Sequence, residues 1–281
     1  MRHPALLIAG HGSRDPAGAA EFFQMVGRVR AMAPELEVEG GFIELSPPPL
    51  PVAVEALVAA GARGVVVVPA MLLAAGHAKG DIPASIARER LAHPGVKFRY
   101  GRDLGIHPDL LAVVRQRIEE AVAPPERTET AVLLMGRGSS DPDANADLYK
   151  IARLLHEGSP YPFVEACFAG ITGPRLSQGL ERCRRLGARW VVVVPYLLFT
   201  GVLVERISVQ VAPLPSATVA RHLWPDDRIA RLILARYREA IEGDPRMNCD
   251  LCIYRVALPG FEHRVGSAAV PHHHPHVPVT S

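Results

Sequence analysis

The sequence lacks the features that would place the chain in a membrane or on a nucleic acid. No apolar stretch approaches the roughly 20 residues that a membrane helix needs, and the N-terminal apolar run is too short for a signal-peptide core. The net charge is only +2, aromatic residues make up 6%, and no long run of Lys or Arg occurs. Such values argue against nucleic-acid binding. We therefore expect a cytoplasmic protein with neither a membrane nor a nucleic acid as partner.

Cysteine is also scarce. Four cysteines in 281 residues do not suggest a disulfide framework. Two of them, Cys249 and Cys252, form a CxxC pair near the C-terminus, which indicates metal or redox chemistry instead. Hydrophobic residues, by contrast, make up 48% of the chain, and the mean hydropathy is +0.12. The chain can therefore build substantial cores, and its length leaves room for two domains.

Strand-like and helix-like segments alternate along the first half of the chain, as is typical of a parallel sheet. The apolar spacing and the turn residues predict strands over residues 5–10, 37–43, 65–68 and 96–100, and helices over residues 17–32, 52–60 and 107–122. A further helix is expected to begin at Asp81, with that side chain as its cap. In this arrangement the segment 70–80 is a loop after the third strand.

This pattern returns 126 residues later. The glycine-flanked turn and the following Asp-Pro pair recur with one spacing: Gly12-Ser13, Asp15-Pro16, Gly138-Ser139 and Asp141-Pro142. The sequence thus predicts an α/β fold with two similar domains, each a small parallel β-sheet flanked by helices, related by a pseudo-two-fold axis. We place the domains at 1–123 and 131–246, a linker at 124–130 and a tail at 247–281, with a helix over 226–242 closing the second domain.

The two halves differ in the polar residues at their strand ends. His11 becomes Arg137, Glu44 becomes Gly170, and His77 faces an apolar residue in the second half. Because the carboxyl ends of parallel strands share one edge, we expect His11, Glu44 and His77 to converge. Two imidazoles and a carboxylate suit a divalent transition metal with open coordination positions, and these groups also accept protons near neutral pH.

Three first-half motifs carry a family resemblance. Gly10-His-Gly-Ser-Arg14, Phe42-Ile-Glu-Leu-Ser46 and Gly76-His-Ala-Lys-Gly-Asp-Ile-Pro83 resemble the signature segments of the sirohydrochlorin chelatases, in particular the long, two-domain CbiX type. The resemblance spans about residues 5 to 243. It implies the class II chelatase fold and insertion of Co²⁺ into the tetrapyrrole sirohydrochlorin during cobalamin biosynthesis. It also implies that His11 and His77 are the catalytic pair and that Glu44 helps to hold the metal, with no organic cofactor.

Such a substrate is rich in carboxylates and needs hydrogen-bond donors around its rim. The helix N-termini that follow Ser13 and Ser139 could supply backbone N–H groups. Charge could come from four basic side chains, Arg14, Lys79, Arg137 and Arg175. We interpret the change from histidine to arginine at position 137 as a switch from catalysis to carboxylate clamping, and a purely structural arginine is the alternative.

The tail after residue 246 has motifs of its own. Cys249 and Cys252 lie in an MxCxxC element that, by the same resemblance, implies an iron–sulfur cluster. Two cysteines supply only half of the usual four ligands, so a redox pair, a zinc site or two idle thiols remain open. The histidines between His272 and His276 suggest metal storage or delivery, or a tail without a role.

Other functions fit parts of the same pattern. Insertion of Fe²⁺ in sirohaem synthesis uses the same residues and ranks second to cobalt. A metal storage or chaperone protein could use His11, His77 and the histidine-rich tail, but it would need no large cleft between the halves. A phosphohydrolase built on His11 and Arg14 fits least. Such enzymes need the order Arg-His-Gly, which this turn does not have, and no partner motif appears. A homodimer is possible as the assembly, since a second subunit could complete a cluster.

Overall fold

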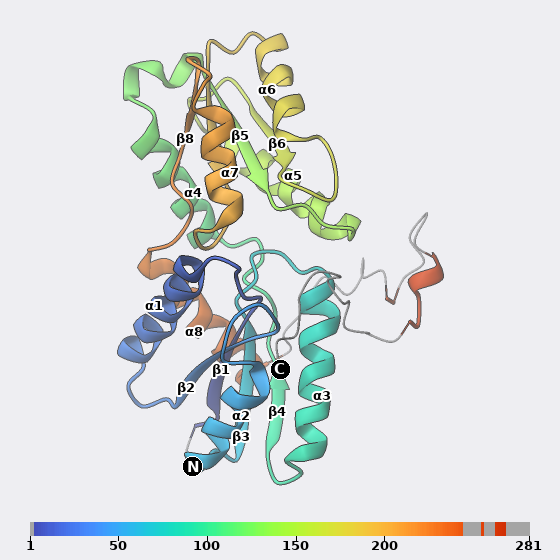
Figure 1. The fold of residues 1–281 in the computed structure, drawn as a ribbon. Helices are drawn as coiled ribbons and strands as arrows, with labels where there is room; N and C mark the ends of the chain where they lie inside the picture. The colour runs from blue at the N-terminus through green and yellow to red at the C-terminus, as the bar shows by residue number, and fades with distance from the viewer. Residues whose placement is uncertain (1–2, 244–253, 256–261, 268–281) are drawn as a thin grey trace.

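We describe the protein from a computed structural model, which describes residues 3–243, 254, 255 and 262–267. Two sheets of four parallel strands, one from each half, lie one above the other (Figure 1). The first contains β1 (Ala5–Gly10), β2 (Val38–Phe42), β3 (Gly64–Pro69) and β4 (Lys97–Tyr100) in the order β2-β1-β3-β4. The second contains β5 (Thr130–Gly136), β6 (Val164–Phe168), β7 (Trp190–Pro195) and β8 (Ala217–Val219) in the order β6-β5-β7-β8. The expected fold class and the internal repeat are confirmed.

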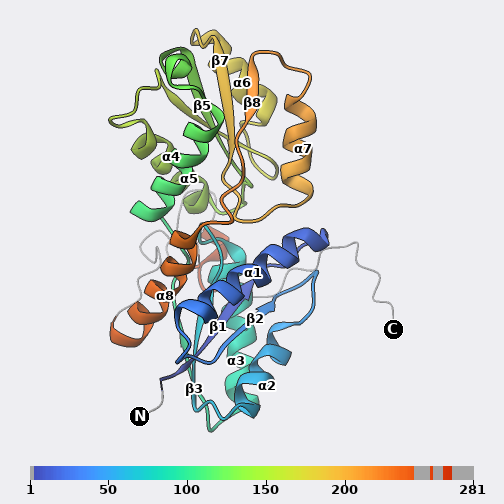
Figure 2. The ribbon, with the colours of Figure 1, turned by 90° about the vertical axis from the view of Figure 1, so that its left-hand side faces the viewer.

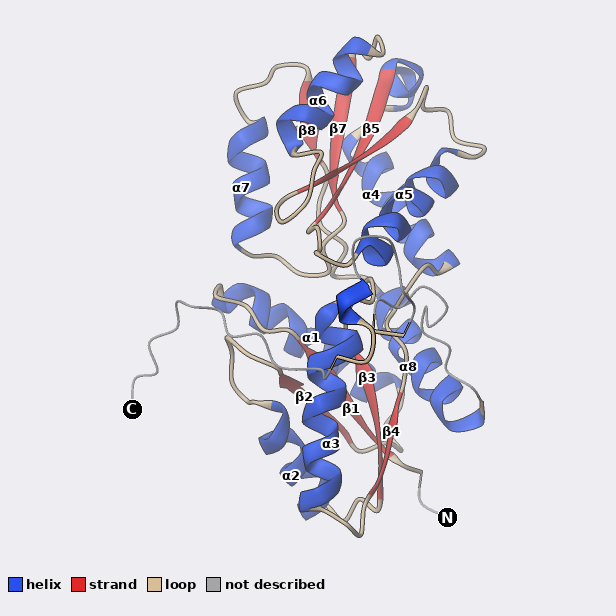
Figure 3. Cartoon of the chain, turned by 90° about the vertical axis from the view of Figure 1, so that its right-hand side faces the viewer, coloured by secondary structure: helices blue, strands red, loops and turns tan. Residues whose placement is uncertain are grey.

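Helices cover both faces of each sheet (Figure 3). They are α1 (Pro16–Met32), α2 (Leu50–Ala59), α3 (Ile82–Ala92), α4 (Pro108–Ala121), α5 (Pro142–His156), α6 (Leu176–Arg185), α7 (Val202–Val211) and α8 (Asp227–Glu242). Three short turns complete the described elements: η1 (His77–Asp81, a π-helical turn), η2 (Pro124–Glu129) and η4 (Glu262–Arg264). None of the helices that the structure describes is long and apolar enough to cross a membrane.

Alternation along the strands divides the core of the first half into two layers. Leu6 and Ile8 of β1 face the layer that contains α1, and Leu7 and Ala9 face the layer that contains α2 and α3. All four side chains are fully buried. Because both faces of the sheet are covered, its strands read as continuous apolar runs rather than as an alternating pattern.

The two halves exchange their last helices, which corrects the expected domain closure. Helix α8 was expected to close the second domain, but it packs on α1, β3 and β4 of the first (Figure 2). Helix α4, from the first half, packs on α5 and β7 of the second. Arg117 of α4 ties the crossing segments together, because its buried guanidinium donates to the carbonyls of His222, Leu223 and Pro225 at 2.9 to 3.0 Å.

The segment predicted as a linker is also more ordered than expected. Residues Pro124–Glu129 form the 3-10 helix η2, and Thr130 is a buried residue of β5 rather than the end of a linker. The Thr130 hydroxyl donates to the carbonyl of Glu126 at 2.8 Å and fastens this turn to the strand. The boundaries drawn from the sequence at 123 and 246 therefore divide the repeat but not the two packed units.

Candidate active site

A cavity of about 820 Å³ lies between the two halves, and it is lined by the loops that follow β1, β3, β5 and β7. This volume is in the range of pockets that enclose a whole small-molecule ligand. Most of its lining is apolar, and its large side chains include Phe22, Phe42, Leu45, Ile171, Tyr196 and Phe199. The cavity thus offers apolar walls, with polar groups concentrated at the strand ends.

His11 and His77 lie on one wall of this cavity, and Glu44 lies directly beside them. One potential ligand atom from each residue lies within 4.8 Å of those from the other two. Nε2 of His11 is 3.3 Å from Oε1 of Glu44, and the two imidazole rings meet edge to face with 4.4 Å between their centroids. The convergence expected from the shared sheet edge is therefore what the structure contains. Among the described residues this is the one group of three such side chains so placed.

The glycine after His11 makes this approach possible. Gly12 has a φ of +102°, and a Cβ atom at this position would lie 1.8 Å from the carbonyl oxygen of Glu44. Any other residue would force the two turns apart. The Glu44 amide donates to the His11 carbonyl at 3.2 Å, which continues the pairing of β1 and β2 beyond the strands. Local backbone packing therefore sets the distance between the first two side chains of the cluster.

His77 is held by a residue that the sequence reasoning assigned a different role. It lies in the first turn of η1, not in a loop, and its Nδ1 is 2.6 Å from Oδ2 of buried Asp81. Asp81 was expected to cap α3, but it has a helical backbone and makes no capping hydrogen bond. A carboxylate on Nδ1 fixes the orientation of the imidazole ring, as in carboxylate–histidine–metal sites. The spacing of four residues was the one signal available for this pair.

His11 is kept neutral by its surroundings. Its Nδ1 is 3.0 Å from the carbonyl oxygen of Gly12, an acceptor that favours the tautomer with the proton on Nδ1. Burial lowers the pKa of His11 to about 4, with further lowering by the charges of His77 and Arg137 and a smaller opposing effect from Gly12 and Glu44. Its Nε2 has no hydrogen-bond partner among the described residues. Near neutral pH this buried atom thus carries a lone pair beside the Glu44 carboxylate.

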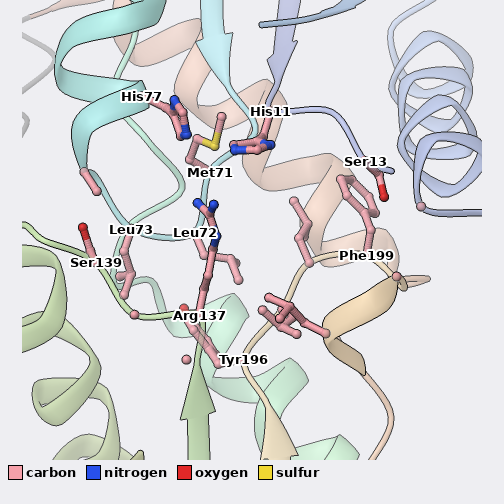
Figure 4. A pocket seen from close by; sticks show the side chains of 18 of the residues that line it. His11, Ser13, Met71, Leu72, Leu73, His77, Arg137, Ser139, Tyr196 and Phe199 are labelled. Atoms are coloured by element: carbon pink, nitrogen blue, oxygen red, sulfur yellow. The ribbon is translucent and has the colours of Figure 1, made fainter. Parts of the chain in front are cut away.

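Arg137 stands where His11 stands in the first half, on the opposite wall. Figure 4 shows its side chain extending from the second half toward His11 and His77. Burial lowers the pKa of Arg137, and the charge of Glu44 partly offsets this effect. The guanidinium keeps its charge in spite of this shift. One wall of the cavity therefore carries metal-competent groups and the other a fixed positive charge.

The comparisons with known proteins agree with this geometry. The CbiX family model matches residues 5–121 and again 131–240, so each half matches it separately. The chain belongs to the CbiX family. It is 41% identical to the sirohydrochlorin cobaltochelatase of Priestia megaterium over 90% of this chain and 85% of that protein. It is 34% identical to the sirohydrochlorin ferrochelatase of Bacillus subtilis over 84% of this chain and 91% of that protein.

Solved structures of CbiX relatives share the two-domain arrangement. SirB from Bacillus subtilis with Fe³⁺ superposes with a TM-score of 0.75 at 34% identity and covers 85% of this chain and 96% of its own. The sirohydrochlorin chelatase SirB from Bacillus subtilis subspecies spizizenii in complex with cobalt gives a TM-score of 0.70 at 33% identity, with 85% of this chain and 95% of that chain covered. The same architecture has therefore been crystallised with either metal.

Lys79 does not have the surroundings expected of a substrate-binding residue of this CbiX chain. Its Nζ donates to Oδ2 of Asp141 at 2.7 Å and to Oδ2 of Asp143 at 2.9 Å, and its side chain is only 3% exposed. Although burial lowers the pKa of Lys79, the two hydrogen bonds and the two charges outweigh it, so that the pKa is raised. Lys79 therefore joins η1 to the start of α5 and does not line the cavity.

Of the other residues expected to bind the substrate, some line the cavity and some do not. Ser13 and Arg14 line the cavity, as expected for contacts with a substrate. Arg175 does not line it; it is exposed at the start of α6, where its amide donates to Gln178 at 2.8 Å. At each of the two helix N-termini a side-chain cap satisfies one amide, because Asp15 accepts from Ala17 and Asp141 accepts from Asp143. Binding of substrate carboxylates at the other amides of these N-termini stays a prediction.

The cysteines expected to hold a cluster, Cys249 and Cys252, lie outside the described residues, as does the histidine-rich tail. The other two cysteines, Cys167 and Cys183, are buried in the second half. Burial raises the pKa of each of these two thiols to about 12. Buried thiols of this kind are poor metal ligands, so they do not supply the missing half of a four-cysteine site. The iron–sulfur cluster stays a prediction.

Proposed function

We propose that the protein inserts Co²⁺ into sirohydrochlorin, in the cavity between its two halves. The observation that carries the proposal is the cluster of His11, Glu44 and His77, whose two histidines line one wall of a large apolar cavity. A flat macrocycle needs apolar walls, and the ion needs donors on one face of the ring. The identity of 41% with a cobaltochelatase supports cobalt over iron, for which the ferrochelatase identity reported above is 34%.

The chemistry divides between the three side chains. In the reaction two pyrrole N–H protons leave the ring and Co²⁺ takes their place among the four ring nitrogens. His11 and Glu44 hold the ion, because a histidine that stays neutral keeps its lone pair for the metal. His77 would contribute its Nε2 to the same ion. Once the ion has left this nitrogen for the ring, His77 would accept one pyrrole proton, and the other would pass to water. Asp81 stabilises the imidazolium that forms.

Arg137 acts on the tetrapyrrole rather than on the metal. Its guanidinium matches the geometry of a carboxylate and stays charged at any working pH. We assign it to a carboxylate of the tetrapyrrole, which it holds against the second half while the ion approaches from the first. Ser13 and Arg14 serve the same rim from the first half.

The first test is anaerobic incubation of the full chain with sirohydrochlorin and Co²⁺. The absorption spectrum of the ring reports the insertion. We expect insertion at many times the spontaneous rate, and Fe²⁺ tested in parallel compares the second candidate metal. Stoichiometric Co²⁺ binding without any acceleration would favour a storage or chaperone protein instead. The apolar cavity speaks against that rival, because a protein that only stores ions has no use for it.

A further inference from the structure

Two residues that line the cavity adopt a backbone conformation that side chains usually avoid. Leu45 and Ile171 both have a φ of +66°. Each is the centre of a three-residue turn, closed by hydrogen bonds from Ser46 N to Glu44 O at 2.8 Å and from Thr172 N to Gly170 O at 2.7 Å. These are γ-turns of the positive-φ kind, which is rare and strained. For a β-branched residue such as Ile171 a positive φ is especially costly.

Close packing against a neighbouring turn holds each of these turns in place. In the first half the carbonyl of Glu44 lies against Gly12, and in the second half the carbonyl of Gly170 lies against Gly138. A Cβ atom on either glycine would be 1.8 or 2.1 Å from the carbonyl oxygen that it faces. Strained residues persist where the surroundings fix them in this way, and they cluster at ligand-binding sites.

The second half has kept this turn although it has lost the metal ligands. Glu44, which begins the first turn, is replaced by Gly170, and His11 by Arg137. The metal chemistry therefore does not require the strain at Ile171. The strained turn must therefore serve a function that both halves share. Both Leu45 and Ile171 present a bulky apolar side chain to the same cavity. Ile171 is 61% exposed, so its side chain contributes little to the core.

We propose that Leu45 and Ile171 are substrate-positioning residues that contact the sirohydrochlorin ring, one from each half. This inference rests on the proposed function and extends it to the apolar contacts that hold the macrocycle. A ring placed between the halves covers both side chains and removes their apolar surface from water. The γ-turns aim these side chains at the ring, at a cost in stability that glycine would avoid.

The test is the variant Ile171→Gly, studied by thermal unfolding and by titration of the metal-free protein with sirohydrochlorin. Glycine adopts the positive φ without strain, so the melting temperature should rise by about 2 °C. Loss of the side chain should weaken the affinity for sirohydrochlorin about tenfold. The variant Ile171→Leu, which copies the residue of the first half, should bind as the wild type does.

Leu186→Gly is the matched control, because Leu186 is 59% exposed in the same half but does not line the cavity. It has a negative φ, so glycine there should lower the melting temperature and leave the affinity unchanged. Unchanged affinity, or a lower melting temperature, for Ile171→Gly would overturn the inference. If the wild-type protein itself does not bind sirohydrochlorin, the proposed function fails and the inference falls with it, so the two failures are distinguishable.

Discussion

The two halves of this CbiX protein share one backbone plan and differ at the strand ends. The first half presents His11 and His77 to the cavity, with Glu44 packed beside them, and the second presents Arg137 from the position equivalent to His11. The turns and strands are the same on both sides, so the scaffold does not dictate the chemistry. The repeated sheet thus forms two walls, and we propose that one holds the metal and the other a carboxylate of the substrate.

The joints between the halves differ as well. On the His77 side, Lys79 reaches across to Asp141 and Asp143 with a buried charge. The equivalent positions do not repeat this network, because Glu205 stands where Lys79 stands and Ala17 where Asp143 stands, although Asp15 repeats Asp141. On that other side Glu21 accepts from the amide of Thr200 at 2.7 Å and lies 3.0 Å from Nε2 of His222. The flank beside the metal cluster is therefore fixed by a buried lysine between two aspartates, which the other flank does not repeat.

The largest effect should come from the histidines of the first half. His11→Ala and His77→Ala should each lower the rate of Co²⁺ insertion by about a hundredfold or more, because a metal ligand or a proton acceptor is lost. The measurement is the initial rate at saturating sirohydrochlorin. His93→Ala is the control, since this first-half histidine pairs with Glu89 and does not line the cavity. A rate within threefold of the wild type in either alanine variant would remove that histidine from the mechanism.

The second-largest effect should be a loss of stability when the contact of Lys79 with Asp141 and Asp143 is broken. Lys79→Met leaves Asp141 and Asp143 buried without their cation, which should lower the free energy of unfolding by about 3–5 kcal/mol. Urea unfolding measures this loss. Arg153→Met is the control, because its exposed pair with Glu157 on α5 should contribute less than about 1 kcal/mol. Equal effects in the two variants would mean that Lys79 does not fix this flank.

The low pKa of His11 predicts how stability depends on pH. Between the pKa of about 6.5 in the unfolded chain and about 4 in the folded protein, the unfolded state binds the additional proton. His11 therefore contributes no penalty above pH 6.5 and destabilises the fold as the pH falls toward 4, by about 2.5 kcal/mol at pH 4.5. The check is the difference between wild type and His11→Gln in urea unfolding at pH 7 and pH 4.5. A pH dependence that is the same in both proteins would contradict a buried, neutral His11.

The smallest effect should come from Arg137, on the wall opposite the histidines. Arg137→Ala should raise the KM for sirohydrochlorin about tenfold and change kcat less, because one charged contact to the substrate is lost. It should also raise the pKa of His11, since the Arg137 charge lowers it. The acid limb of the rate profile then moves to higher pH. An unchanged KM would leave Arg137 with a structural role alone.

The cluster could be predicted from the sequence because its geometry follows from topology. Each member lies in the segment that follows a different strand of one parallel sheet, and such strand ends share an edge. The repeat then distinguished chemistry from scaffold, since His11, Glu44 and His77 are polar residues at strand ends that the second copy lacks. The role of Gly12 also follows from the local chain, because a histidine between two glycines indicates a tight turn.

The parts that could not be predicted depend on contacts between distant segments. Lys79 looked like a free rim cation because Asp141 and Asp143 reach it only once the halves are assembled. Asp81 looked like a helix cap because the π-helical turn that redirects it toward His77 has no signature in the composition. The exchange of α4 and α8 depends on Arg117 and the crossing segments, which leave no periodic signal.

The most direct test of the division between the walls is His11→Arg, which gives the first half the residue of the second. The measurement is sirohydrochlorin binding and Co²⁺ insertion on one anaerobic sample of the variant. We predict that the variant still binds sirohydrochlorin within about threefold of the wild type, since the apolar walls and Arg137 remain, and that its insertion rate falls about a hundredfold or more. Insertion at the wild-type rate would contradict the assignment of the metal chemistry to the His11 wall.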